Sequence, residues 1–171
     1  VSEGINERGD GIQHYMIARY SWAHPRLFVD HWGKPLFTLL SSPFAQLGYA
    51  GMVCFNAVLA IITGYLAILL LRKTGGVAQI AFPVLMLLSP QYVLVIMNGM
   101  TEVLFGLLSV VTVYLLYREK YWMAAMIASF SPFARPEYAL FLPMVALWLA
   151  WCGQWKAIPL LVVGFTVYGL V

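Results

Sequence analysis

The longest uncharged stretch of this chain, Tyr49 to Leu71, limits the possible folds more than any other feature. As an α-helix its 23 residues would rise about 1.5 Å each, which is enough to cross a hydrocarbon layer of about 30 Å. The whole chain is 62% hydrophobic and 10% charged, whereas a soluble domain carries about 25% charged residues. The sequence therefore predicts a membrane-spanning helix over residues 49–71.

Five further apolar segments predict additional helices: Val77 to Met97, Glu102 to Tyr117, Tyr121 to Ala134, Tyr138 to Trp151, and Ala157 to Val171. The later segments are short, since a helix of 14 residues reaches only about 21 Å. Such a segment spans a membrane only if the bilayer is thinned or the helix is extended or broken. We therefore predict an all-α fold, with residues 49–171 forming a polytopic transmembrane helix bundle that is part of a larger membrane domain.

Basic residues in the short connections predict the orientation of this bundle. They occupy alternate connections, at Arg72-Lys73, at Arg118 and Lys120, and at Lys156. Lys and Arg near helix ends are retained on the cytoplasmic side of a membrane. Residues 1–48, 98–102 and 135–137 would then face the periplasm or the lumen. We expect an integral protein of the bacterial inner membrane or the endoplasmic reticulum.

This orientation places six of the seven acidic residues on the extracytoplasmic side, and only Glu119 falls on the other. The six are Glu3, Glu7, Asp10, Asp30, Glu102 and Glu137. A side with so many carboxylates near two polar breaks between helices is where catalytic chemistry would gather.

Residues 1–48 predict an extracytoplasmic loop with amphipathic helices that lie on the membrane surface. After Gly9-Asp10-Gly11, side chains recur at helical spacing at Ile12, Tyr15, Met16, Arg19 and Tyr20. Leu36 to Leu40 resumes apolar character and predicts a second interfacial helix.

Asp10 has two interpretations. An aspartate between glycines is a good helix cap and suits the positive end of the helix dipole. A carboxylate held near a membrane face can also accept a proton from an acceptor hydroxyl, and the glycines leave room for a substrate. The two roles can coexist.

Two further polar breaks carry candidate site residues. Glu102 opens a helix after Asn98-Gly99-Met100-Thr101, where a structural role at the helix start is one interpretation. Because a charge facing lipid costs about 2.5 to 3.5 kcal/mol, Glu102 should instead face protein, water or the interface. In Arg135-Pro136-Glu137, the proline breaks the helix and the guanidinium could hold a phosphate through two parallel hydrogen bonds. An internal pair between Arg135 and Glu137 is the structural alternative.

Other binding chemistry has weaker signals. Asp30-His31 could bind a metal or steer a proton, but adjacent residues without other ligands favour a solvated loop. We assign no metal ligands and no certain cofactor, although several carboxylates leave a divalent metal possible. Cys54 and Cys152 are predicted to be packing residues. Nucleic acid is excluded as a partner, since no basic stripe is interleaved with aromatics.

Taken in order, these features resemble the N-terminal half of a membrane-embedded glycosyltransferase of the GT-C superfamily. The shared features are an acidic first outer loop with amphipathic helices, then a Thr-Glu turn at Thr101-Glu102, then the Arg-Pro-Glu break at residues 135–137. The superfamily includes the protein O-mannosyltransferases and the aminoarabinose transferases, which use polyprenyl-phosphate sugars.

The resemblance implies a role for each candidate residue. Asp10 would deprotonate or orient the hydroxyl of a lipid, glycan or protein acceptor, which attacks the anomeric carbon with inversion. Arg135 would neutralise the leaving lipid phosphate. Glu102, the second residue that we class as catalytic, and Glu137 would orient Arg135 or complete the cavity. His14 and Arg19, which follow Asp10 on the same predicted helix, are further candidates for substrate binding. Some relatives have two adjacent acids in this loop, whereas here the nearest acid to Asp10 is Glu7, which could share the role only if the segment between them is helical.

Two other functional classes remain open. A transporter or channel subunit would also use broken helices with Arg and Glu near a membrane, but it should show polar residues deep within successive helices. A non-catalytic membrane assembly subunit would use the first loop to dock a partner, and would tolerate loss of the Asp10 carboxylate.

Overall fold

A computed structural model describes residues 9–72 and 77–170, and all regular secondary structure in these two ranges is helical. The all-α prediction is therefore confirmed. Glu3, Glu7 and Lys73, which entered the predictions from sequence, lie outside the described residues, so a contribution of Glu7 beside Asp10 stays a prediction.

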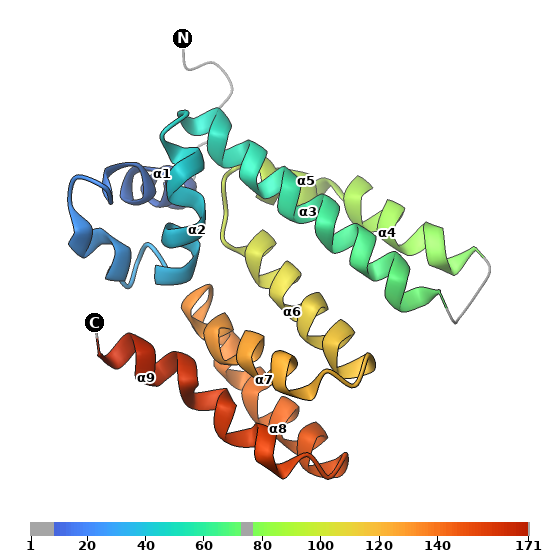
Figure 1. Cartoon of the computed structure of the whole chain (residues 1–171). Helices are drawn as coiled ribbons and strands as arrows, with labels where there is room; N and C mark the ends of the chain where they lie inside the picture. The colour runs from blue at the N-terminus through green and yellow to red at the C-terminus, as the bar shows by residue number, and fades with distance from the viewer. Residues whose placement is uncertain (1–8, 73–76, 171) are drawn as a thin grey trace.

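The first loop forms a compact group of helices beside the start of the long helix (Figure 1). It comprises α1 (Asp10–Tyr20), the 3₁₀ helix η1 (Pro25–Val29) and α2 (Pro35–Ala45). Helix α1 buries Gly11, His14 and Ala18, while Met16 and Tyr20 are exposed. The buried face thus differs from the apolar set predicted at helical spacing, because two small residues allow α1 to pack closely on its neighbours.

Two predicted helices have the expected bounds, α3 (Tyr49–Leu71) and α6 (Glu102–Tyr117). The segment between them is divided into α4 (Ala78–Leu88) and α5 (Pro90–Met97), whose axes differ by 57°. Ser89 at the break has an extended backbone, with φ −62° and ψ 120°. A residue before proline disfavours the helical conformation, which accounts for the break at this position.

The last third of the chain is a series of short helices. They are α7 (Tyr121–Phe130), η2 (Ser131–Phe133), η3 (Pro136–Phe141), α8 (Leu142–Trp151), η4 (Trp155–Val162) and α9 (Val163–Gly169). Pro132, Pro136 and Pro159 fall at the start of, or within, the three 3₁₀ segments. Each proline removes a backbone donor, so the apolar stretches cannot continue as long α-helices.

Only α3, among the described helices, is long and apolar enough by itself to cross a membrane. The bent pair α4 and α5 would make a second crossing if it forms one broken span. Helix length therefore does not support a polytopic bundle, because prolines and tight turns divide the other apolar segments into helices of 16 residues or fewer.

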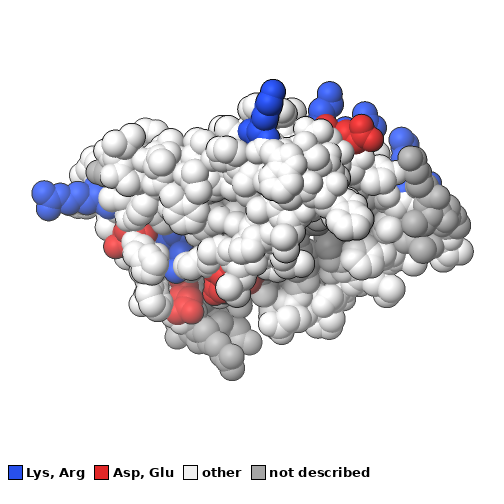
Figure 2. All heavy atoms as spheres, turned by 90° about the horizontal axis from the view of Figure 1, so that it is seen from below, with Lys and Arg blue, Asp and Glu red and all other residues white. Residues whose placement is uncertain are grey.

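The charged connections lie at opposite ends of these helices. In Figure 1, the end of α3, the α6–α7 turn and the α8–η4 turn lie at the lower right, and α1, α2 and the α5–α6 turn lie at the upper left. In Figure 2, acidic side chains lie with Lys and Arg on the left, and a single acidic group lies among Lys and Arg at the upper right. One further basic group projects at the top centre, and the rest of the surface between is uncharged, so the described part of the chain has two charged ends separated by a largely uncharged middle.

Two apolar cores hold the helices together. The first includes Phe37, Met52, Phe55 and Leu104, and joins α2, α3 and α6. The second joins α7, η3, α8 and η4 around residues such as Tyr138 and Leu149. Ala134, which directly precedes Arg135, is buried in the first core. This contact attaches the Arg135 break to the end of the molecule that carries α1 and α2.

Candidate functional site

Arg135 is the centre of a charged cluster at the acidic end of the molecule. Its Nη1 atom lies 2.5 Å from Oε1 of Glu102, which begins α6. Its Nη2 and Nε atoms donate to Oε1 and Oε2 of Glu137, at 3.0 Å and 3.2 Å. The guanidinium thus joins the start of α6 to the start of η3, and the internal pair between Arg135 and Glu137, which was the structural alternative to phosphate binding, is present.

The two carboxylates on Arg135 are in different surroundings. The Glu102 side chain is 38% exposed, and its Oε2 atom is buried with no hydrogen-bond partner among the described residues. The Glu137 side chain is 58% exposed. Hydrogen bonds from Arg135 are the main cause that lowers the pKa of Glu137 to about 2, and the bond to Glu137 in turn raises the pKa of Arg135. Arg135 and Glu137 are therefore both charged at neutral pH.

Close packing at Gly11 brings α1 to this cluster. A Cβ atom added to Gly11 would lie 1.9 Å from the carbonyl oxygen of Asn98 in the α5–α6 turn. The same turn accepts a hydrogen bond from the Tyr49 hydroxyl, at Met97 O, and one from Asn56 Nδ2, at Met100 O. Helix α1 therefore lies directly against the turn that presents Glu102.

His14 lies where α1 meets the charged cluster. Its side chain is 6% exposed, and Nδ1 has no hydrogen-bond partner among the described residues. Burial lowers the pKa of His14, and the charge of Lys34 lowers it further, whereas the carboxylates of Asp10 and Glu102 raise it. Arg135 also lowers it. The imidazole is therefore neutral at pH 7, and four charged groups from separate segments act on it.

Asp10 is the first residue of α1 and is exposed. Gly9 occupies the cap position, and no side chain of the described residues makes a capping hydrogen bond there. The carboxylate therefore does not act as a side-chain cap, although its place in the first turn suits the helix dipole. Asp10 and His14 are separated by four residues, so they share one face of α1.

Lys34 is a charged neighbour that the sequence analysis did not select. It lowers the pKa of both His14 and Glu137, which places its charge near the same cluster. Its backbone φ is +58°, and its Nζ donates to the His31 carbonyl at 3.3 Å. Asp30 closes the preceding turn, where its Oδ1 accepts from the Gly33 N–H at 2.9 Å. A positive φ at a residue other than glycine leaves no pattern in a single sequence.

Arg19, in contrast, contacts an aromatic side chain of its own helix. Its Nη1 donates to the Tyr15 hydroxyl at 2.6 Å, and its guanidinium lies over the Tyr15 ring. The Tyr15 ring meets the Tyr49 ring edge to face. Arg19 thus stabilises the packing of α1 on α3, and its role in substrate binding stays a prediction.

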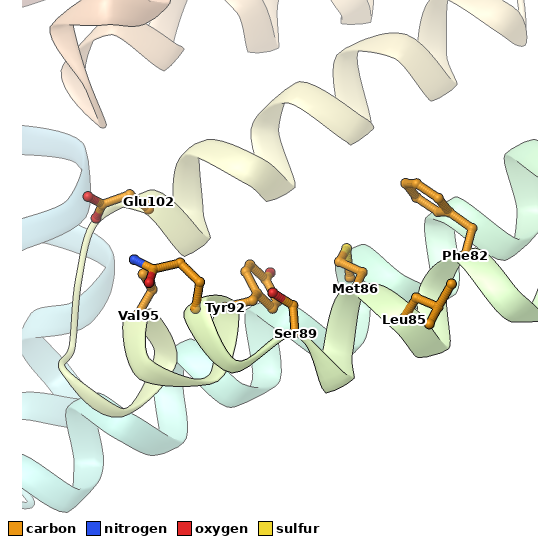
Figure 3. Close-up of a pocket in the computed structure, with 8 residues that line it drawn as sticks. Phe82, Leu85, Met86, Ser89, Tyr92, Val95 and Glu102 are labelled. Carbon is orange, nitrogen blue, oxygen red and sulfur yellow. The ribbon is translucent and has the colours of Figure 1, made fainter.

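An apolar groove leads away from the charged cluster. Its volume is 530 Å³, and it is lined by Phe82, Leu85, Met86, Ser89, Gln91, Tyr92, Val95 and Glu102. Figure 3 shows the labelled side chains in a row along α4 and α5, with Glu102 at one end and Phe82 at the other. The bend at Ser89 therefore helps to form a groove that has Glu102 at one end, with the carboxylate of Glu102 turned away from the groove.

A second hollow is lined by residues of the first loop, of the segments around the Arg135 break and of α9. It has a volume of 180 Å³, and its lining includes His31, Lys34, Phe133, Pro136 and Tyr168. The Tyr168 hydroxyl donates to the Val29 carbonyl at 3.0 Å, which joins α9 to the first loop. Lys34 is thus the cationic group of this hollow.

Among the described residues, no group of three or more His, Cys, Asp or Glu side chains is placed to hold a metal ion. Cys54 and Cys152 are both free thiols. The charged cluster consists of Arg135 and the two glutamates that pair with it, Glu102 and Glu137.

No protein-family model, curated protein or solved structure matches this chain.

Proposed function

We propose that this chain is part of an inverting GT-C-type glycosyltransferase, which moves a sugar from a polyprenyl-phosphate donor to an acceptor at the extracytoplasmic membrane face. The observation that carries the proposal is the meeting of Arg135, Glu102, His14 and Asp10 at one end of the helices. These residues come from three separate segments. They supply a carboxylate that can accept the proton of an acceptor hydroxyl and a guanidinium that can bind a phosphate.

Asp10 is suited to be the catalytic base, because its carboxylate is exposed at the start of α1 and next to two glycines. It takes the proton of the acceptor hydroxyl while the hydroxyl oxygen attacks the anomeric carbon of the donor sugar. The bond from that carbon to the phosphate oxygen breaks, and the bonding electrons leave with the phosphate. Attack opposite to the leaving group inverts the anomeric configuration.

Arg135 and Lys34 are suited to the leaving phosphate. Negative charge grows on the phosphate as the glycosidic bond breaks, and fixed cations at that position lower the barrier. Glu102 orients Arg135 through its ion pair, and neutral His14 lies beside this pair without adding a positive charge that would compete for Asp10. The apolar groove that ends at Glu102 fits the first prenyl units of a donor chain.

We also propose how the chain is arranged in the membrane. The apolar middle of the molecule faces lipid, with the basic connections in the cytoplasm and the charged cluster in the periplasm or lumen. The helices of 16 residues or fewer reach at most about 24 Å, so they cross together with their 3₁₀ extensions in a locally thinned bilayer.

The test is an assay of sugar transfer by the full-length protein in membranes, with a panel of radiolabelled polyprenyl-phosphate sugars. Asp10→Asn should lower transfer by at least about a hundredfold, because the amide cannot accept the proton. Asp30→Asn is the matched control, since its amide oxygen still accepts from the Gly33 N–H and transfer should be unchanged. Transfer that is equal in wild type and Asp10→Asn would remove Asp10 as the base, and no transfer from any donor would count against the proposed function.

A further inference from the structure

The position of the Glu137 carboxylate is favourable for an anion for two independent reasons. Arg135 presents the Nε and Nη2 edge of its guanidinium there, with donor distances of 3.2 Å and 3.0 Å. Two parallel hydrogen bonds from one guanidinium edge are also the geometry with which arginine holds a phosphate. The charge of Lys34 acts on the same carboxylate. Arg135 therefore binds this carboxylate directly, and the charge of Lys34 favours an anion at the same position from further away.

The two carboxylates on Arg135 differ in how easily they can leave. Glu102 has a buried oxygen, and its pair with Nη1 is attached to the first turn of α6. Removing it would leave a half-buried guanidinium without its inner partner. Glu137 is 58% exposed and can turn its carboxylate into water at little cost. An exposed ion pair of this kind is weak, because water screens its charges and both side chains lose freedom when it forms.

Charge balance prevents Glu137 and a second anion from sharing Arg135. Counted as formal charges by residue type, the three acids Asp10, Glu102 and Glu137 outnumber the two bases Arg135 and Lys34 by one. The cluster therefore has a net charge of −1 before any ligand binds. A phosphate beside Glu137 would add its full charge to the cluster, whereas a diester that takes the place of Glu137 on Arg135 would exchange one negative charge for another, and a monoester would add less than it does beside Glu137.

We infer that the Glu137 carboxylate occupies the phosphate site of Arg135 in the ligand-free protein, and that a phosphate monoester or diester binds by exchange with it. Glu102 stays on Nη1 and keeps the guanidinium in place during the exchange. Glu137 is then a residue that sets affinity and selectivity for the oxyanion, while Arg135 is the group that touches it. The inference rests on the proposed function for the identity of the natural ligand, a polyprenyl phosphate.

The experiment measures binding of a sugar-free polyprenyl monophosphate to the full-length protein in lipid nanodiscs. Glu137→Gln keeps the shape of the side chain and removes the competing charge, so the dissociation constant should fall by about fivefold, the factor that corresponds to an exposed pair of about 1 kcal/mol. Glu137→Ala, which removes the carboxylate altogether, should act in the same direction. Glu119→Gln is the matched control, because it removes one acidic charge at the opposite end, and its affinity should equal that of wild type.

Arg135→Gln supplies the second control. It should abolish most binding, and adding Glu137→Gln to it should give no recovery. Equal or weaker binding by both Glu137 variants would overturn the exchange, and so would a gain that is the same in Glu119→Gln or that persists without Arg135. A complete lack of binding in every variant would also overturn it.

Sugar transfer, assayed in the same preparations, separates this inference from the proposed function. Tighter binding in the Glu137 variants without transfer of any sugar would leave the exchange intact and reject the glycosyltransferase. Normal transfer with unchanged phosphate affinity in the Glu137 variants would reject the exchange alone.

Discussion

Replacing Gly11 by alanine should push apart the two parts of the candidate site, α1 with Asp10 and the α5–α6 turn with Glu102. Its Cβ would lie 1.9 Å from the Asn98 carbonyl oxygen and 3.0 Å from the carbonyl carbon. Ordinary contact begins at 3.4 Å, so α1 and the α5–α6 turn would have to move apart by about 1.5 Å. Because both contact atoms belong to the backbone, no side-chain rotation can relieve the overlap.

This displacement should affect activity more than stability. Overpacking at a close contact costs about 1 to 3 kcal/mol, so Gly11→Ala should fold with a lowered melting temperature. A misplacement of about 1 Å between groups that act together can reduce a rate by about a hundredfold, and Asp10 moves with α1 while Glu102 moves with the turn. We expect at least that loss in sugar transfer.

Gly9→Ala is the matched control on the other side of Asp10. No atom lies within 4 Å of a Cβ added at Gly9, and its φ of −49° suits alanine. The assay compares transfer and thermal unfolding of both variants in the same detergent. If Gly11→Ala unfolds and transfers sugar like Gly9→Ala, α1 does not pack on the Asn98 turn and the proposed union of Asp10 with Glu102 and Arg135 is refuted.

Two further predictions concern the same end of the molecule. Burial lowers the pKa of His14, so below about pH 6.5 the unfolded chain binds a proton more readily than the folded chain does. The contribution of His14 to stability should therefore be full above that pH and decline below it. His14→Gln should flatten this part of the curve of melting temperature against pH, and an unchanged slope would contradict the burial of His14. Asn56→Ala removes the 2.9 Å bond to the Met100 carbonyl and should cost about 1 kcal/mol in thermal unfolding. Ser109→Ala, which removes a bond within α6 only, should cost less, and equal losses would show that the bond from Asn56 does not support the turn.

The sequence could predict those parts of the fold that depend on a long uniform pattern. Helix α3 has the predicted bounds because charges flank an uncharged stretch, and α6 begins at Glu102 because a polar turn precedes it. The division between α4 and α5 was missed, although Pro90 was a visible signal of a break. A continuous apolar composition concealed it, since hydropathy does not distinguish a straight helix from two bent ones.

The candidate site could be predicted as a set of residues but not as an arrangement. Alternating basic connections placed Asp10, Glu102, Arg135 and Glu137 at one end, because topology alone sorts short loops between two sides. The resemblance alone suggested that Glu102 and Glu137 orient Arg135; spacing along the chain did not indicate that Arg135 pairs with both at once, since Glu102 is far from it in sequence. Lys34 was missed for another reason: its position depends on a loop whose backbone is held by the Asp30 turn.

The division of labour between α1 and the Arg135 break follows from the opposing needs of the two reacting groups. A carboxylate acts best as a general base when it is not paired with a cation, whereas a leaving phosphate needs nearby cations. If the same carboxylate and cation paired with each other, neither would be available for its role. Here Asp10 lies on α1, Arg135 and Lys34 lie on two other segments, and the charges of all three act on the buried, neutral His14. A protonated His14 would attract Asp10 and weaken it as a base. The burial that lowers the pKa of His14 therefore protects the base, which is why His14→Lys should reduce transfer far more than His14→Gln does, even where both variants fold.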